Sequence, residues 1–276
     1  NGPYLIHCKG NGVRKLEDMK GLKIRGATRM INKMIETLGA TIILMASRAL
    51  AASARDAADY EQVYGSILTK VSRPVILHWL GEMFDPALAG YWGASTFEQA
   101  LDTALAVING NVASVDGIKI SLLDKDKEIQ LRRRLPAGVK MYTGDDFNYA
   151  ELIAGDDQGF SHALLGIFDA IAPAASYALS RLAAGDEAGF HDVLGPTVPL
   201  SRHIFKAPTR FYKTGIVFMA YLNGHQDHFT MVGGAQAMRP LPYFTEIFQL
   251  ADQARLLSDP ELAVRRMKHL LAVYGA

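Results

Sequence analysis

The chain has 276 residues, of which 49% are hydrophobic, 21% are charged and 9% are aromatic. This composition excludes a disordered tail, a collagen-like repeat and a disulfide-stapled scaffold, and it is typical of a globular protein with a sizeable core. Lysine and arginine number 29 against 28 aspartate and glutamate residues, so the formal net charge is +1. Because no basic excess is available for a phosphate backbone, we expect no nucleic-acid partner.

Export and membrane signals are not visible in the sequence. The first residues show no basic segment followed by an apolar stretch, and the longest apolar runs are far shorter than the roughly 20 residues that cross a bilayer. Cys8 is the only cysteine and cannot form an intrachain disulfide, which fits a reducing compartment. We therefore expect a cytoplasmic protein with no membrane partner.

Short apolar, β-branched runs predict six strands, at 22–25, 41–45, 74–79, 117–120, 139–142 and 162–167. Nearly continuous apolar strands between helices are typical of a parallel sheet covered on both faces. Apolar residues at helical spacing, such as Leu101, Leu105 and Ile108, predict connecting helices over 57–71 and 97–108. Alternation of strand and helix indicates βαβ units with right-handed crossovers.

The C-terminal part has a helical pattern, punctuated by prolines, with helices predicted over 170–184, 186–194, 200–206, 209–222, 242–257 and 260–273. A complete (β/α)₈ barrel needs eight strand–helix units, and the pattern supplies six strands. The sequence therefore indicates an α/β fold. It is either a (β/α)₈ TIM barrel incomplete on its N-terminal side or an open doubly wound sheet. We expect barrel units over 41–170 and a C-terminal helical region of the same domain over 171–276.

Polar residues follow several of the predicted strands. In parallel α/β folds the chemistry gathers at the carboxyl ends of the strands. Inspection of these ends gives a set of candidate site residues: Ser47, His78, Lys119, Thr143, Asp145, Asp146 and Asp169.

Lys119 stands inside an apolar strand pattern, between Ile118 and Ile120. Burial disfavours its ammonium form, and lowering a lysine pKa from about 10.4 to about 7–8 takes roughly 4 kcal/mol. The free amine can attack a carbonyl and form a Schiff base. In the alternative interpretation, strand alternation turns Lys119 outward, with its aliphatic stem under a helix and its charge in solvent.

The other candidates also have two interpretations. His78 can relay protons near neutral pH or serve as a hydrogen-bonded core residue. Asp145 and Asp146 can bind a metal or a sugar hydroxyl, or they can cap the next helix. His225 and His228 have no third ligand nearby in sequence, which favours an exposed turn over a zinc site. We predict no metal and no cofactor.

From about Thr41 onwards, the segments 42–50, 75–86, 117–121, 142–148 and 223–228 carry a resemblance to a known superfamily. They resemble the dihydrodipicolinate synthase and N-acetylneuraminate lyase superfamily, and more closely an uncharacterised bacterial branch of it, known as a domain of unknown function. The resemblance implies a (β/α)₈ barrel with C-terminal helices and a homo-oligomer. It also implies a Schiff-base lysine followed by an acidic residue, matched by Lys119 and Asp124, and a later Gly-Asp-Asp turn, matched at 144–146.

The chain departs from the superfamily pattern at two places. The superfamily ends its fifth strand with a proton-relaying tyrosine, and His78 stands at that position here. A histidine would relay protons with a different geometry and pKa. The Thr-Thr carboxylate-binding turn and the Gly-rich segment of the first barrel strands are not found, so 2-keto-acid specificity does not follow from the resemblance.

Residues 1–40 resemble a different family, the DctP-type solute-binding proteins of tripartite ATP-independent periplasmic (TRAP) transporters. The resemblance is carried by 15–26 and 35–40, and Arg25 occupies the position of an arginine near the organic-acid site of that family. The two resemblances meet near Ala40. We therefore expect a fusion, a recombined gene or an artefact of sequence assembly, with residues 1–40 as a strand–helix segment of different origin.

Three functions are compatible with the sequence. In the first, a class I aldolase or lyase, Lys119 forms an iminium with a small-molecule carbonyl substrate (a keto acid or a sugar derivative). His78 moves the proton, and the substrate is bound by Ser47, Thr143, Asp145, Asp146 and Asp169. The second is a periplasmic organic-acid-binding protein with Arg25 as carboxylate clamp. The third is an inactive truncated barrel, whose unpaired strand edges favour self-association.

Overall fold

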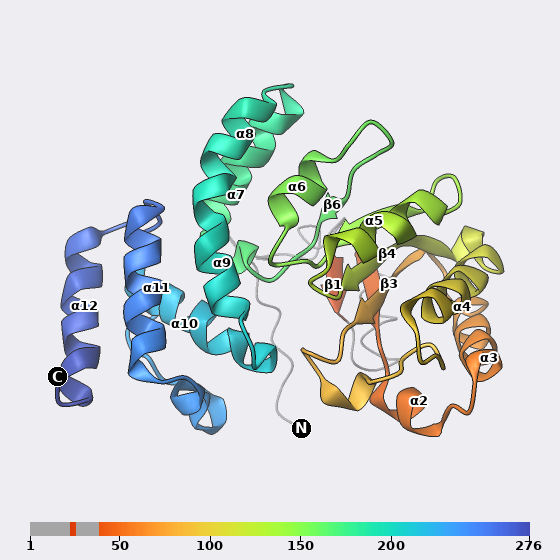
Figure 1. Ribbon diagram of the computed structural model, residues 1–276, viewed down its shortest axis with the longest axis horizontal. Helices are drawn as coiled ribbons and strands as arrows, with labels where there is room; N and C mark the ends of the chain where they lie inside the picture. Colours follow the sequence, from red (N-terminus) through yellow and green to blue (C-terminus); the bar gives the residue numbers. More distant parts are fainter. Residues whose placement is uncertain (1–22, 26–38) are drawn as a thin grey trace. The chain divides into compact units, whose positions relative to one another are not determined.

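The computed structural model describes residues 23–25 and 39–276 (Figure 1). Its strands form one six-stranded sheet whose order follows the chain, and the ladders β1–β2, β2–β3 and β5–β6 are parallel. The strands are β1 (Lys23–Arg25), β2 (Thr41–Met45), β3 (Val75–Leu80), β4 (Val115–Ser121), β5 (Lys140–Thr143) and β6 (His162–Ala163). Within the described residues no ladder joins β6 back to β1, so this sheet is open. The predicted α/β class is confirmed.

The chain divides into two compact units. The first unit contains residues up to Leu80, with Ala87–Lys119 and Arg134–Met141. The second unit contains Gly81–Pro86, Ile120–Arg133 and Tyr142–Ala276.

The helices of the first unit begin at side-chain caps. The helices are α2 (Arg48–Ser53), α3 (Ala57–Leu68) and α4 (Phe97–Asn109). Ser47, Asp56 and Thr96 stand immediately before them, and the side-chain oxygen of each accepts a backbone N–H of the first turn. These bonds satisfy amide groups that have no partner inside the helix, which explains where each helix starts.

Aromatic side chains fill the core of the first unit. The Trp92 ring is fully buried and lies 5.0 Å from the Tyr64 ring, 5.3 Å from the Tyr91 ring and 6.0 Å from the Trp79 ring, measured between centroids. Such pairs add to the hydrophobic energy of burial. Trp92 has a φ of 74°, a left-handed conformation that is uncommon for a bulky residue, and the packed rings around it hold it there.

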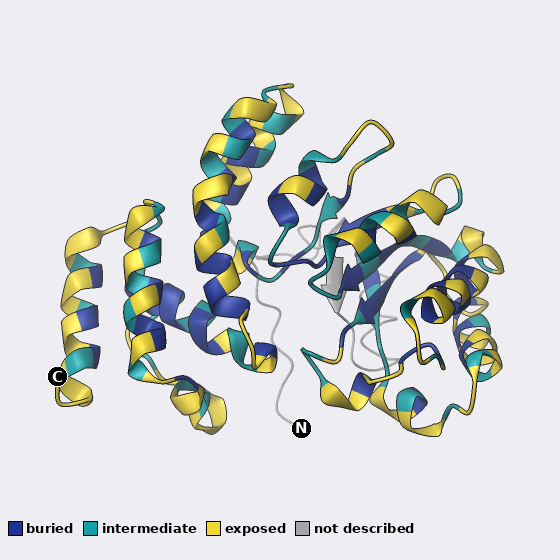
Figure 2. Ribbon diagram, in the orientation of Figure 1, coloured by how far each residue is buried: buried dark blue, intermediate teal, exposed yellow. Residues whose placement is uncertain are grey.

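The second unit is mainly helical. Its helices are α5 (Lys125–Arg134, whose last residue lies in the first unit), α6 (Tyr149–Ala154), α7 (Phe168–Ala183), α8 (Glu187–Leu194), α9 (Val198–Phe205), α10 (Tyr212–Leu222), α11 (Leu241–Gln253) and α12 (Pro260–Val273). Figure 2 shows α11 and α12 buried along one face and exposed along the other, as amphipathic helices are. The core includes the fully buried rings of Phe190, Phe205, Phe218 and Phe244.

The predicted helices are confirmed, with corrections at their ends. α12 has the predicted bounds, because Asp259 caps it and Pro260 suits its first turn. α11 ends at Gln253 rather than at 257, because Arg255 adopts a left-handed φ of 56° that stops the helix.

The last predicted strand is wrong in length. It was expected over 162–167, and β6 pairs with β5 only at His162 and Ala163. The Leu164 amide still donates to the Thr143 carbonyl (3.2 Å), and the Ile167 amide then donates to the Asp146 carboxylate (2.7 Å). The chain therefore leaves the sheet after Leu164.

Segments 1–22 and 26–38 lie outside the described residues. They contain Cys8 and most of the stretch that resembles a solute-binding protein. β1 is described only as backbone, so the predicted role of the Arg25 side chain stays a prediction. In the part of the chain that the structure describes, no helix is long and apolar enough to cross a membrane.

Candidate active site

Lys119 lies on β4, a strand whose two faces differ. The Ile118 and Ile120 side chains are 0% and 1% exposed, and alternation places Lys119 on the opposite face, together with Gly117 and Ser121. Lys119 itself is half-buried. The strand therefore holds the amine at a fixed position near its carboxyl end, two residues before Ser121.

His78 on β3 stands beside Lys119. Just beyond these strands, the Gly81 amide donates to the Ser121 carbonyl at 3.0 Å. In a parallel ladder this bond pairs Leu80 with Ser121 and, two residues earlier, His78 with Lys119. Residues paired in this way project to the same face of the sheet. The structure therefore brings together the two residues that the sequence analysis assigned to catalysis.

The His78 ring contacts the sulfur atom of a methionine on the neighbouring strand β2. His78 is 5% exposed, and its Nδ1 lies 3.1 Å from the Sδ atom of Met45, its partner in the β2–β3 ladder. A thioether can only accept a hydrogen bond, so the contact is a weak N–H···S bond in the tautomer that carries its proton on Nδ1. In that tautomer Nε2 is the nitrogen that can act as a base.

Ser47, a predicted substrate-binding residue, serves as a helix cap. Its Oγ accepts the Leu50 amide at 3.2 Å, which starts α2. Its own amide donates to the Tyr91 hydroxyl at 3.0 Å, and the Tyr91 and Tyr64 hydroxyls are 2.9 Å apart. Burial raises the pKa of both tyrosines, so both phenols stay neutral. We define Ser47, Tyr91 and Tyr64 as the tyrosine brace.

Thr143 at the end of β5 points toward α5. Its hydroxyl donates to Oε2 of Glu128 at 3.0 Å and accepts the Asp145 amide at 3.1 Å. By strand alternation, the neighbouring Tyr142 faces the other side. Tyr142 pairs in register with His162, and their rings are 5.4 Å apart.

Asp145 and Asp146 are buried, and both accept hydrogen bonds from other residues of the second unit. Asp145 Oδ1 accepts the amides of Phe147 (2.7 Å) and Asn148 (3.0 Å), and Oδ2 accepts the Asn148 side-chain amide at 2.9 Å. Burial raises the pKa of Asp145, and these three bonds oppose the rise. Asp146 holds the Ile167 amide through its carboxylate, and its carbonyl accepts the Ser201 hydroxyl at 2.5 Å. The structure gives α6 no side-chain cap, so these carboxylates hold backbone amides before α6 and at Ile167 instead of capping the next helix.

Glu128 is a buried residue that the sequence analysis missed. It is 1% exposed on α5, and burial raises its pKa to about 7. The hydroxyls of Ser161 and Thr143 and the charge of Arg132 oppose this rise, and the charge of Asp145 adds to it. The α5 sequence is dominated by charged residues, so Glu128 resembled a solvated helix position. The missed signal was its spacing of three from Leu131, the other buried residue of this helix.

Asp169, a predicted substrate-binding residue, and the pair His225 and His228 are all exposed. Asp169 is exposed in the first turn of α7, where a carboxylate complements the helix dipole. His225 and His228 are exposed in the turn after α10, as the sequence predicted. Among the described residues, no group of three or more histidine, cysteine, aspartate or glutamate side chains is placed to hold a metal ion.

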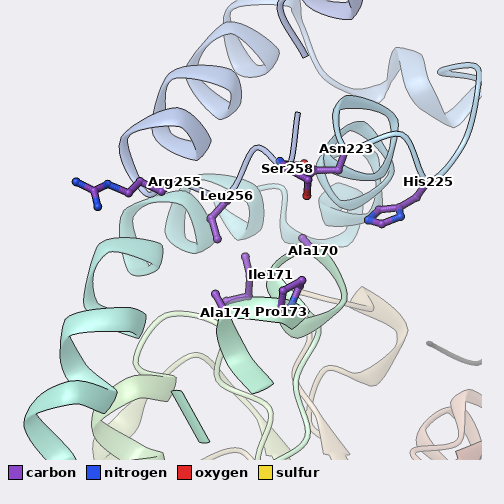
Figure 3. Close-up of a pocket in the computed structure, with 9 residues that line it drawn as sticks. All are labelled: Ala170, Ile171, Pro173, Ala174, Asn223, His225, Arg255, Leu256 and Ser258. Carbon is purple, nitrogen blue, oxygen red and sulfur yellow. Dashed lines mark hydrogen bonds between the residues drawn. The ribbon is translucent and has the colours of Figure 1, made fainter. Parts of the chain in front are cut away.

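A small cavity of about 110 Å³ lies in the second unit (Figure 3). His225 lines it, and none of the seven candidate residues at the strand ends does. Asn223 and Ser258 border one side, and their loops are joined by a 2.8 Å bond from the Ser258 amide to the Asn223 side chain. Ile171 and Pro173 border the opposite side, and Figure 3 shows the Arg255 side chain pointing away from the other lining residues. The cavity is therefore lined mainly by apolar and neutral polar residues.

Comparison with known proteins gives a family and a fold. The family model described as "Protein of unknown function (DUF993)" matches residues 8–276. Among solved structures, a proposed dihydrodipicolinate synthetase from Pseudomonas aeruginosa is similar with a TM-score of 0.61 and 16% identity, over 84% of this chain and 74% of that one. A proposed dihydrodipicolinate synthase family protein from Coccidioides immitis has a TM-score of 0.56 and 13% identity, over 86% and 73%. A search of curated proteins finds no match.

These findings confirm the predicted fold and leave the resemblance to a solute-binding protein without support. The structural likeness confirms the predicted fold of the (β/α)₈-barrel type with a helical C-terminal extension. The family model runs without a break from residue 8, through the region where a junction near Ala40 was expected. The expected fusion with a solute-binding protein is therefore not supported.

Proposed function

Because the chain belongs to the DUF993 family of proteins of unknown function and shares its fold with proposed dihydrodipicolinate synthases, we propose that it is a Schiff-base-forming class I aldolase or lyase. Its substrate class is a keto acid or a sugar-derived carbonyl compound. The observation that carries the proposal is the pairing of His78 with Lys119 on one face of neighbouring strands. An amine nucleophile beside a proton-transfer group is the minimum that iminium chemistry requires.

Each residue has a defined step in this proposal. The free amine of Lys119 attacks the carbonyl carbon, and loss of water gives an iminium. In cleavage, His78 Nε2 removes the hydroxyl proton of the leaving fragment, which departs as an aldehyde or ketone. The electrons of the broken carbon–carbon bond pass to the iminium and form an enamine. His78 then returns the proton to the enamine carbon, and hydrolysis of the resulting iminium releases the product and restores Lys119.

Borohydride trapping tests the assignment of Lys119. The protein is incubated with pyruvate and borohydride, and peptide mass spectrometry locates the reduced adduct. We expect the adduct at Lys119, and we expect Lys119→Ala to abolish it. Lys125→Ala is the matched control, since Lys125 is a lysine of α5 that pairs with Glu151 at 2.6 Å. Equal labelling of Lys119→Ala and wild type would show that the assignment is wrong.

Proton exchange tests the role of His78. We expect His78→Asn to retain the trapped adduct and to slow exchange of the pyruvate methyl protons in D₂O by about 10²-fold, because the base is lost and the nucleophile is kept. Mass spectrometry of the recovered pyruvate measures this rate. An unchanged rate would remove His78 from the mechanism.

A further inference from the structure

A continuous hydrogen-bond chain joins Glu128 to the turn after β5. The Asp145 amide donates to the Thr143 hydroxyl, and the Thr143 hydroxyl donates to the Glu128 carboxyl group. Thr143 is 0% exposed, Glu128 and Asp145 are each 1% exposed, and all three belong to the second unit. In such a chain each bond polarises the next, so a change at the carboxyl group reaches the Asp145 amide.

Among the described residues, no lysine or arginine forms an ion pair with the carboxyl group of Glu128. Arg132 lies one turn later on the same helix, at a spacing that commonly forms ion pairs. Its guanidinium instead pairs with Asp156 at 2.6 Å and reaches the Ser161 hydroxyl at 3.4 Å. The Oε1 atom of Glu128 has no hydrogen-bond partner among the described residues. A buried carboxyl group in this setting is costly to ionise.

We propose that Glu128 is a positioning residue for the Gly144–Asp146 turn, acting through the Thr143 hydroxyl, and that its charge state sets how firmly the turn is held. An ionised carboxylate accepts the Thr143 hydroxyl in a charge-assisted bond, and protonation weakens that bond. The groups that face Glu128 are Arg132 on its own helix, Thr143 and Asp145 after β5, and Ser161 before β6. The link to catalysis rests on the proposed function: the Gly144 amide of this turn donates to the carbonyl of Ile120, the residue after Lys119, at 2.8 Å.

The first test uses NMR and requires no activity. In full-length protein labelled with ¹⁵N-aspartate, we expect the Asp145 amide shift to titrate once between about pH 6 and about pH 8. Glu128→Gln should abolish this step, because glutamine can accept the Thr143 hydroxyl but cannot ionise. Thr143→Val should uncouple the Asp145 amide from Glu128, and Glu151→Gln, which removes an exposed carboxylate of α6, should change nothing. A flat Asp145 titration in wild type, or a step that survives in Glu128→Gln, overturns the proposal.

The second test connects the residue to the chemistry. We expect the wild-type rate of borohydride trapping, divided by the Glu128→Gln rate, to rise about fivefold from about pH 6 to about pH 8, as the charged form holds the turn. A constant ratio overturns the catalytic part of the inference. If no variant forms an adduct at Lys119, the proposed function fails, and the NMR titration still decides whether Glu128 positions the turn.

Discussion

The carboxyl ends of β3 and β4 differ from the turn after β5 in how their polar groups are used. At the end of β3, the Nδ1 atom of the His78 ring lies 3.1 Å from the Met45 thioether, which is a weak acceptor. After β5, the oxygens of Asp145 accept three bonds, and Thr143 both donates and accepts. The first region has the features of reacting groups, and the second has those of a scaffold.

This difference shows that acidic residues after a strand do not by themselves make a reactive site. A carboxylate whose lone pairs are filled by nearby amides has its geometry fixed by the backbone, so it can shape a turn. Lys119 instead stands between two buried isoleucines of one strand. Substitutions should therefore separate the two regions, with activity lost at one and stability lost at the other.

The largest expected effect is at Lys119. Lys119→Met keeps the length of the side chain and removes the amine, so the rate of carbonyl turnover should fall by about 10³-fold or more. The free energy of unfolding should change by less than about 1 kcal/mol, because methionine keeps the aliphatic stem of the half-buried side chain. Trapping kinetics and urea denaturation measure the two quantities. Strong destabilisation with retained activity would show that Lys119 has a structural role and no catalytic one.

The ionisation of Glu128 should make the free energy of unfolding depend on pH. Its pKa is raised from 4.5 to about 7 by folding, so the native state binds this proton more tightly than the unfolded state. The contribution of Glu128 to the unfolding free energy is therefore highest below about pH 4.5 and falls as the pH rises to about 7. Above that pH the contribution stays constant, and the total loss of unfolding free energy is about 3 kcal/mol.

The measurement is the difference in unfolding free energy between wild type and Glu128→Gln, which cancels the titration of the other groups. Urea denaturation across this pH range should show the wild type losing stability relative to the variant. A difference that does not change with pH would mean that Glu128 titrates as an ordinary exposed carboxylate.

Asp145 should matter for stability. Asp145→Ala removes three hydrogen bonds to a buried carboxylate and leaves two backbone amides near α6 without acceptors, which should cost about 2 kcal/mol. Thermal unfolding measures the loss. Asp145→Asn, which keeps one carbonyl oxygen, should recover part of it. No loss in Asp145→Ala would place Asp145 among the reacting groups instead.

The smallest expected effect is at Ser47. Ser47→Ala removes the cap of α2 and should cost about 1 kcal/mol of unfolding free energy. Ser47→Thr should retain the cap. A loss of activity larger than this change in stability would support the predicted role of Ser47 in substrate binding.

Local patterns predicted much of this architecture. Helix α12 was predicted to the residue, because a capping aspartate followed by a proline is a strong local signal. Strand β2 was predicted equally well from its run of apolar, mostly β-branched residues. Lys119 and His78 could be selected because polar residues are conspicuous in apolar strands.

The direction of Thr143, the burial of Glu128 and the end of β6 could not be predicted from local patterns. They depend on strand register and on packing between residues distant in sequence. The sequence favoured Thr143 as a site residue, and only the bond to Glu128 shows that it points toward α5. Glu128 was missed because α5 is rich in charged residues, and its burial arises from packing with residues distant in sequence, such as Ser161. The early end of β6 follows from the bond between Asp146 and Ile167, a contact across 21 residues.

The tyrosine brace has a consequence for the conditions under which α2 stays anchored. Both of its bonds join uncharged groups, the Ser47 amide to Tyr91 and Tyr91 to Tyr64. Dissolved ions screen attraction between charges and have little effect on such bonds. High ionic strength should therefore leave the start of this helix in place, while it weakens exposed ion pairs such as Arg55 with Asp59 at the start of α3.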